Sequence, residues 1–179
     1  MPVEAGTPHL DSPASVGQAF LAESRQSLRG SLAKIAHCLD QLADEDVWWR
    51  PFETANSIEN ILLHLSGNVR QWIGDALAGR PDLRDRAAEF AERRQIPKEE
   101  LLNTLRATLD DADQALAAFS ESRLLEPMRV QGFDISPLVA IYDAVSHFAG
   151  HTQQIVYITR LRLGDKYTFQ WTPTKEQGG

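Results

Sequence analysis

Apolar residues recur at alternating steps of three and four positions in four long stretches of the chain. This spacing places them along one side of an α-helix and is typical of helices that pack in a bundle. It predicts four long helices, over residues 12–42, 56–79, 97–119 and 137–164. The positions that define the seams are Leu28, Leu32, Ile35, Leu39 and Leu42; Ile58, Ile61, Leu62, Leu65, Val69, Trp72, Ile73 and Ala76; Leu105, Leu109, Ala112, Leu116 and Phe119; and Ala140, Ala144, His147, His151, Gln154 and Ile158.

Start and stop signals support these boundaries. Ser12 followed by Pro13 is a typical first turn, with a serine cap and a proline at the first helical position. Asn56 with Glu59 three residues later resembles a capping box at the start of the second helix. Gly79 is a typical stop signal at its end.

The segments between the predicted helices differ in character. Residues 43–55 break the helical pattern. Residues 80–95 are highly charged and form a connection that could contain a short helix. Residues 124–136 are expected to form a small hairpin around Gln131 and Gly132.

These elements predict an all-α fold, a four-helix bundle with long crossover loops after the second and third helices. The fourth helix has apolar residues nearly all round and is expected to be the most buried. One domain is predicted over residues 15–172, with flexible tails at 1–14 and 173–179. The aromatic residues after position 165 are expected to fold back on the bundle.

Composition and charge narrow the classes of function. The chain has 179 residues, enough for one domain with a sizeable core, and it carries a net charge of −7. Such a surface repels phosphate backbones, so no nucleic-acid partner is expected. The short cluster of Glu89, Glu92, Arg93 and Arg94 balances its own charge and is interpreted as a solvated face.

Other features bear on where the protein works. No apolar run approaches the roughly 20 residues that span a bilayer, so no membrane partner is expected. The first thirteen residues lack the basic and apolar regions of a secretory signal. Cys38 is the one cysteine, so an intrachain disulfide cannot form. Together these features favour a cytoplasmic protein.

The main candidate for chemistry is a pair of histidines in the fourth helix. His147 and His151 are four residues apart, a spacing that puts both imidazoles on one face and often offers them to one metal ion. Two core histidines that only hydrogen-bond to neighbours give the same pattern. His64, in the second helix, lies on a polar flank, where it could be solvated or bonded to Asn60 or Asn68.

Several known site types do not match the sequence. A bundle di-iron site requires Glu-x-x-His, and no glutamate precedes His64, His147 or His151 by three positions. A zincin helix carries glutamate directly after its first histidine, where this chain has Phe148. Nucleophile-elbow, P-loop and dinucleotide motifs are also absent from the sequence.

Several short motifs occur in a specific order and spacing. They are Trp48-Trp49-Arg50-Pro51, Asn56-Ser57-Ile58, His64-Leu65-Ser66-Gly67-Asn68, Gln71-Trp72, Pro81-Asp82-Leu83-Arg84-Asp85, His147, His151, Gln154-Ile155 and Tyr157-Ile158-Thr159. In these motifs the chain resembles the DinB/YfiT-like superfamily of metalloenzymes over about residues 16–171, and it is most similar to a branch of unknown function. The resemblance implies a four-helix bundle, a homodimer, and a divalent metal held by His64, His147 and His151.

The resemblance also suggests a reaction type. Some relatives in the superfamily are transferases that depend on a low-molecular-weight thiol. A divalent metal held by three histidines keeps an open coordination position, at which it could activate water or such a thiol. Zinc or nickel is the expected metal, and iron or manganese is the alternative. We therefore expect a hydrolase or thiol S-transferase with a small-molecule substrate. The alternative is a metal-binding or structural module without turnover.

Three further residues are expected near the metal. Asn68 lies one turn from His64, and Asp143 one turn from His147, so either could orient a ligand imidazole. Gln154 belongs to the same row as the histidine pair. Because an unpaired aspartate on a buried helix is costly, Asp143 is expected to have a partner.

Overall fold

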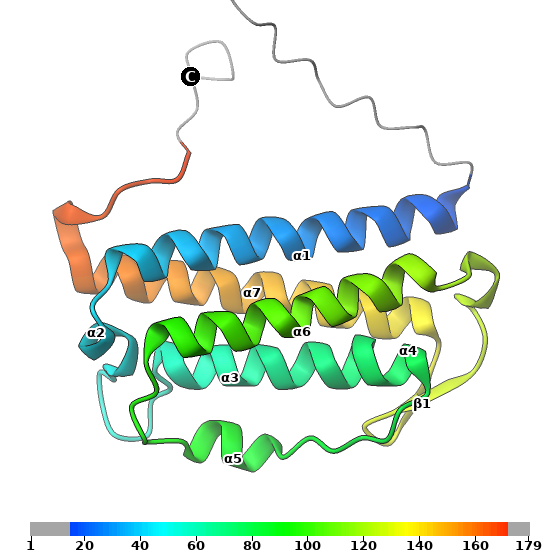
Figure 1. Cartoon of the computed structure of the whole chain (residues 1–179), viewed down its shortest axis with the longest axis horizontal. Coiled ribbons are helices and arrows are strands. Elements are labelled where there is room, and N and C mark those ends of the chain that lie inside the picture. Colours follow the sequence, from blue (N-terminus) through cyan, green and yellow to red (C-terminus); the bar gives the residue numbers. More distant parts are fainter. Residues whose placement is uncertain (1–14, 172–179) are drawn as a thin grey trace, which may run out of the picture.

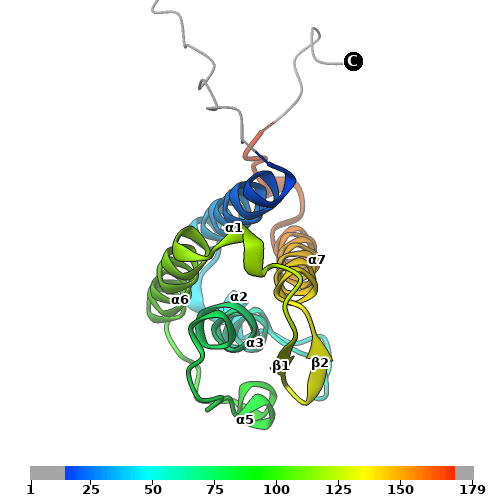
Figure 2. The same cartoon turned by 90° about the vertical axis from the view of Figure 1, so that its right-hand side faces the viewer.

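Four helical segments pack side by side around one apolar core in the computed structural model, which describes residues 15–171 (Figures 1 and 2). The predicted all-α bundle is confirmed. The flexible tails predicted at 1–14 and 173–179 lie outside the described residues. The long segments are α1 (Val16–Gln41), α3 (Ile58–Val69) continued by the π-helix η1 (Arg70–Asp75) and by α4 (Ala76–Ala78), α6 (Lys98–Ala118) and α7 (Pro137–Leu163).

One connection between the long helices runs back along the length of the bundle. α1 and α7 run in one direction and α3 and α6 in the other, as the colours in Figure 1 show. The connection over residues 79–97 therefore returns along the outside of α3, and it carries α5 (Arg86–Ala91). The other long connection, between α6 and α7, joins neighbouring ends. Of the two predicted crossover loops, the loop after the second predicted helix runs the length of the bundle, and the loop after the third does not.

Helix starts differ in detail from the predicted ones. Ser15 caps α1, since its side chain accepts a hydrogen bond from the Gln18 amide; the predicted start at Ser12 lies outside the described residues. The capping box of α3 consists of Ser57 and Asn60, not of Asn56 and Glu59. Sequence spacing could not separate the two pairs, because they differ by a shift of one residue.

Glu59 has a different role from the predicted cap. Its side chain is fully buried, accepts a hydrogen bond from the Ile96 amide at 2.8 Å, and lies 3.6 Å from the Arg50 guanidinium. The sequence also missed α2 (Asp44–Trp48), a short helix with three acidic residues in its first turn. These contacts tie the end of the crossover connection to the start of α3.

The predicted hairpin is confirmed. β1 (Met128–Val130) pairs with β2 (Phe133–Ile135) in antiparallel register. The turn residues Gln131 and Gly132 both have positive φ, 50° and 85°, as a type I′ turn requires. A further 3-10 turn, η2 (Glu121–Arg123), precedes the hairpin. Figure 2 shows the hairpin beside α7 and α3, at the edge of the bundle.

Burial along the helices contradicts one prediction. α3, not α7, is the most completely buried helix: every residue except Leu63 and Gly67 is buried. The α7 helix instead exposes large apolar side chains, with Tyr157 64% and Leu161 57% exposed. The prediction was wrong because an apolar outer face on α7 has the same sequence pattern as a covered one.

After the 3-10 turn η3 (Gly164–Lys166) the chain folds back on the bundle, as expected. The Thr168 backbone amide donates to Gln41, and His37 Nε2 lies 2.7 Å from the Thr168 carbonyl oxygen. Tyr167 packs against the core. These contacts hold the chain after α7 against α1.

Candidate metal site

Three histidines from two helices meet at one point of the bundle. His64 comes from α3, and His147 and His151 come from successive turns of α7. Each offers a ring nitrogen, and the three nitrogens lie within 4.8 Å of one another. The ring centroids are 4.5 to 5.1 Å apart, with interplanar angles of 74° to 81°. The rings therefore stand nearly perpendicular to one another around a common centre.

Acceptor side chains hold the outer nitrogens of two of these rings. Glu89 Oε2 lies 3.0 Å from His64 Nδ1, and Gln154 Oε1 lies 2.8 Å from His151 Nδ1. Arg84 Nη2 is also 3.0 Å from His64 Nδ1, but it donates to Glu89 Oε2 at 2.8 Å. Because a carboxylate oxygen and an amide oxygen can only accept, we assign a proton to His64 Nδ1 and to His151 Nδ1. This leaves Nε2 of both rings with a lone pair.

The Glu89 carboxylate belongs to a buried network that reaches from α5 to α3. Arg84 Nε donates to Glu89 Oε1 at 2.7 Å, and the two side chains are 5% and 10% exposed. Arg84 Nη1 also donates to Gln71 Oε1 at 2.9 Å. A methyl group at Gly67 would overlap Glu89 Oε1 and lie 2.8 Å from its carboxyl carbon. Only glycine at position 67 lets the carboxylate approach α3 so closely.

Electrostatics keep this network charged. Burial opposes ionisation of Glu89, but hydrogen bonds and charge attraction from Arg84 and His64 outweigh it and lower the Glu89 pKa. The carboxylate is therefore ionised at neutral pH. It faces His64 as a charged acceptor, which is the usual partner of a metal-binding imidazole.

The histidines of α7 are neutral at physiological pH. Burial, and then repulsion from His151 and His64, lower the pKa of His147 to about 4. Burial also lowers the pKa of His151, although its hydrogen bond to Gln154 acts in the opposite direction. Neutral imidazole is the form that ligates metal. The cluster therefore needs no proton release from these two rings to accept a cation.

The donor set fits a divalent cation. His64 Nε2 and His147 Nε2 face each other at 2.8 Å, a separation at which they share one proton or both ligate one ion. Three imidazoles from a two-helix scaffold match the nitrogen sets that bind zinc, nickel and iron. Among the described residues no other group of three or more histidine, cysteine or acidic side chains brings its ligand atoms this close together.

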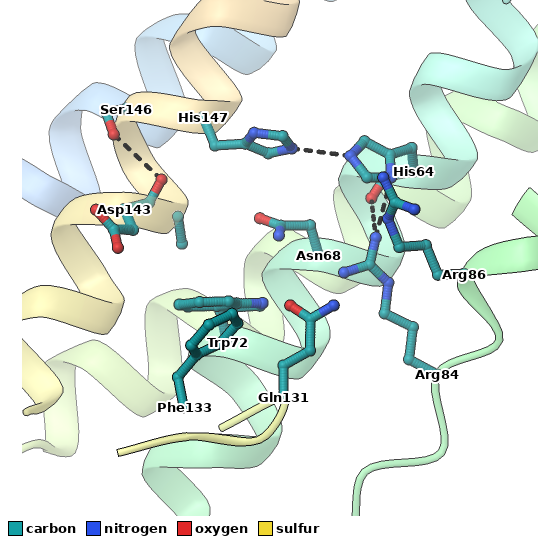
Figure 3. A pocket seen from close by; sticks show the side chains of 11 residues that line it. His64, Asn68, Trp72, Arg84, Arg86, Gln131, Phe133, Asp143, Ser146 and His147 are labelled. Carbon is teal, nitrogen blue, oxygen red and sulfur yellow. Dashed lines mark hydrogen bonds between the residues drawn. The ribbon is translucent and has the colours of Figure 1, made fainter. Parts of the chain in front are cut away.

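A cavity of about 660 Å³ lies next to the cluster and reaches His64 and His147 (Figure 3). Its size is within the range of small-molecule sites. Trp72 and Phe133 line it, with ring centroids 6.3 Å apart. Trp72 belongs to the π-helix η1, a widened turn of a kind that is frequent at functional sites. The hairpin and η1 together therefore supply aromatic walls.

The three other candidates from the sequence have different surroundings. Gln154 contacts His151, as described above. Asn68 is buried and lines the cavity, but its Oδ1 has no partner among the described residues. Asp143 also lines the cavity, but it is exposed rather than buried, and its carboxylate has no partner within residues 15–171, contrary to expectation. Neither Asn68 nor Asp143 hydrogen-bonds to a histidine of the described part of the chain.

The partners of His64 were missed from the sequence. Glu89 was interpreted as part of a solvated face, which is wrong, because its side chain is 10% exposed and bonds to His64 and Arg84. Charge balance along the chain could not reveal that its counterion is Arg84, five residues earlier, across the start of α5. The Pro81-to-Asp85 motif of the family resemblance was the signal that could have pointed to this segment.

The chain is similar to one protein family and to a solved structure. The profile of the family described as "Protein of unknown function (DUF1572)" matches residues 15–175. The crystal structure of a conserved protein from Enterococcus faecalis is similar, with a TM-score of 0.69 and 19% identity, over 80% of this chain and 96% of that one. It supports the fold alone. No curated protein matches the chain. Over residues 15–171 no helix is both long and apolar enough to cross a bilayer. The chain belongs to the DUF1572 family of proteins of unknown function.

Proposed function

We propose that this protein is a DinB/YfiT-like metalloenzyme that holds one divalent cation with His64, His147 and His151. Zinc or nickel is the favoured metal, with iron or manganese as alternatives. The reaction is hydrolysis or thiol S-transfer on a small electrophile. The observation that carries the proposal is the set of three nearly perpendicular imidazoles whose outer nitrogens are held by Glu89 and Gln154.

The cavity favours an enzyme over a structural module. A structural metal site is closed by a fourth protein ligand, whereas a catalytic site keeps a position for substrate. No fourth histidine, cysteine or acidic side chain joins the cluster among the described residues. The cavity of about 660 Å³ reaches two of the three histidines, which gives a substrate access to them.

The residues of the chain have distinct tasks in this proposal. The cation, when bound, supplies Lewis-acid activation of water or of a low-molecular-weight thiol. Glu89 and Gln154 fix the orientation of His64 and His151. Cys38 does not supply the thiol: it is fully buried in the core, where Thr159 and Tyr167 are its hydrogen-bond partners. The thiol must therefore come from a second small molecule.

A homodimer forms part of the same proposal. The α7 helix exposes Tyr142, Tyr157 and Leu161, each more than half accessible in the single chain. A symmetric pair of helices could bury these side chains. Their exposure supports an interface that includes α7.

Metal analysis of purified protein tests the metal site. Wild type is expected to hold about one divalent ion per chain, and His147→Ala to lose most of it. His37→Ala is the matched control, because His37 lies on α1 and bonds to Thr168. Equal metal content in wild type and His147→Ala would overturn the assignment.

A turnover assay tests the enzyme. Wild type loaded with each candidate metal is offered a model electrophile with water alone and with several thiols. His151→Ala is expected to lose the activity, while His37→Ala keeps it. If metal-loaded wild type and His151→Ala give the same rate in every condition, the non-catalytic module is the better description.

A further inference from the structure

The cavity beside the histidines has walls of different chemistry (Figure 3). His64 and His147 lie at one end of it, Arg84 contacts His64, and Arg86 projects from the same side of the cavity. Asp143 and Ser146 lie on the α7 side, away from the arginines. We propose that this cavity binds a small organic carboxylate with an aromatic or flat apolar body, the anionic group lying against Arg86. As a substrate assignment this rests on the proposed function; as a binding site it does not.

The two arginines differ in whether a carboxylate pairs with their charge. The Arg84 guanidinium is neutralised by Glu89 and is 5% exposed. The Arg86 guanidinium forms no ion pair or hydrogen bond with any described residue, and its one ring contact is with Phe90, 4.9 Å from the ring centroid. Its positive charge is therefore available to a ligand. A guanidinium is well suited to a carboxylate, because its planar donors match the two oxygens.

The position of Arg86 determines which end of the ligand lies near the histidines. Arg86 and His147 line the same cavity. Arg86 projects from the same side as His64, opposite the α7 wall (Figure 3). The exposed carboxylate of Asp143 lies on that opposite wall and repels an anion placed there. The anionic group of a ligand is therefore directed toward Arg86 and the histidine cluster.

The remaining walls fit an apolar body. Trp72 and Phe133 tilt toward each other at 39°, with centroids 6.3 Å apart, and Phe133 is 57% exposed although it is aromatic. Exposed aromatic surface in a cavity is an attractive contact for a flat ligand. These two rings come from η1 and from the hairpin, on a different wall from the arginines.

Two buried polar atoms on the cavity wall support a ligand at this place. Asn68 Oδ1 and Trp72 Nε1 have no hydrogen-bond partner among the described residues, and both residues line the cavity. Asn68 is 8% exposed, and Figure 3 shows its amide between His147 and Trp72. Buried polar groups are rarely left unpaired in native proteins. A ligand with polar atoms between its ends would supply the missing partners.

A matched series of probes tests the sign of the charge. Phenylacetate, phenylethanol and phenethylamine share one ring and differ in being anionic, neutral and cationic. Binding is measured by calorimetry on chelator-treated protein and again on metal-loaded protein. Phenylacetate is expected to bind at least about tenfold more tightly than the other two, as one charged hydrogen-bonded pair provides.

Variants assign the binding to the named residues. Arg86→Gln is expected to weaken phenylacetate about tenfold or more, while Arg106→Gln, on α6, leaves it unchanged. Asp143→Asn is expected to keep or strengthen phenylacetate binding, since it removes a like charge. Phe133→Ala is expected to weaken phenylacetate but not acetate. Arg86, Phe133 and Asp143 are exposed, so these variants should fold.

The outcomes separate this inference from the metal proposal. If metal-free protein binds phenylacetate through Arg86 while metal content does not depend on the histidines, the carboxylate site stands and the proposed function fails. If the histidines hold metal but phenylacetate binds no better than phenylethanol, the inference is overturned and the metal site stands. Tighter binding of phenethylamine, lost in Asp143→Asn, or no binding of any probe, also overturns it.

Discussion

Glu89 offers the sharpest test of how the crossover segment serves the histidine cluster. In Glu89→Gln the side chain keeps its shape and an acceptor oxygen but loses its charge. Its contact with His64 Nδ1 is 3.0 Å and its side chain is 10% exposed, so solvent does little to screen the change. Loss of such a partner typically weakens metal binding by about 10- to 100-fold. We expect a loss in this range for zinc or nickel.

The same substitution also affects stability, and the two effects must be separated. Arg84 is 5% exposed, and without Glu89 its charge is buried and unpaired. Breaking a buried pair in this way costs about 3–5 kcal/mol. The double variant Arg84→Met with Glu89→Gln removes both charges and should recover most of this stability. It should not recover metal affinity, because the charged acceptor for His64 is still missing.

Gly67→Ala disturbs the carboxylate without changing its chemistry. The added methyl group would overlap Glu89 Oε1 and approach the Arg84 Nε to 3.0 Å, so the pair must shift and its contact with His64 is disturbed. We expect metal affinity to fall as in Glu89→Gln. Gly30→Ala on α1 is the matched control, since nothing lies within 4 Å of the new methyl group. It should leave metal binding intact and stabilise α1 by about 1 kcal/mol.

Metal affinity is measured by competition with a coloured chelator, and folding by circular dichroism and denaturant titration. Glu126→Gln serves as the charge control, because Glu126 forms an exposed pair with Arg123. Wild-type metal affinity in folded Glu89→Gln and in folded Gly67→Ala would refute the positioning role. Recovery of affinity in the double variant would show that Arg84, rather than the His64 contact, was responsible.

Three further predictions address other parts of the molecule. Asp113→Asn should cost about 0.5–1 kcal/mol at pH 7, where the partly exposed pairs with Arg25 and Arg29 are intact. Arg25, and to a lesser extent Arg29, lower the Asp113 pKa below its ordinary value of 3.8. The stability difference between wild type and Asp113→Asn should therefore shrink as the pH falls below that value, which chemical denaturation at several pH values measures. Cys38 should react with a thiol reagent only after unfolding, since burial raises its pKa and hides it; rapid labelling of native protein would contradict this. Tyr157→Glu should shift a dimer to monomer in light scattering, and a monomeric wild type would count against the α7 interface.

The sequence alone determined the four long helical segments and the identity of the clustered histidines. The steps of three and four along α1, α3, α6 and α7 follow from the 3.6-residue turn, a local property that a linear pattern records directly. The spacing of His147 and His151 is local in the same sense. The addition of His64 depended on the family resemblance, because its partners lie in other segments. The hairpin was also local, since Gln131 and Gly132 accept the positive φ of its turn.

Tertiary structure decided what surrounds those histidines. Glu89 and Arg84 reach His64 only because the chain returns along α3 after α4, a path that local periodicity does not encode. Gly67 is needed at that approach, although in sequence it looks like a mild helix penalty. The sequence could not show that one apolar face of α7 is exposed, for a related reason. Apolar periodicity shows that a side chain prefers burial, whereas only the packing of the other helices decides which faces they cover.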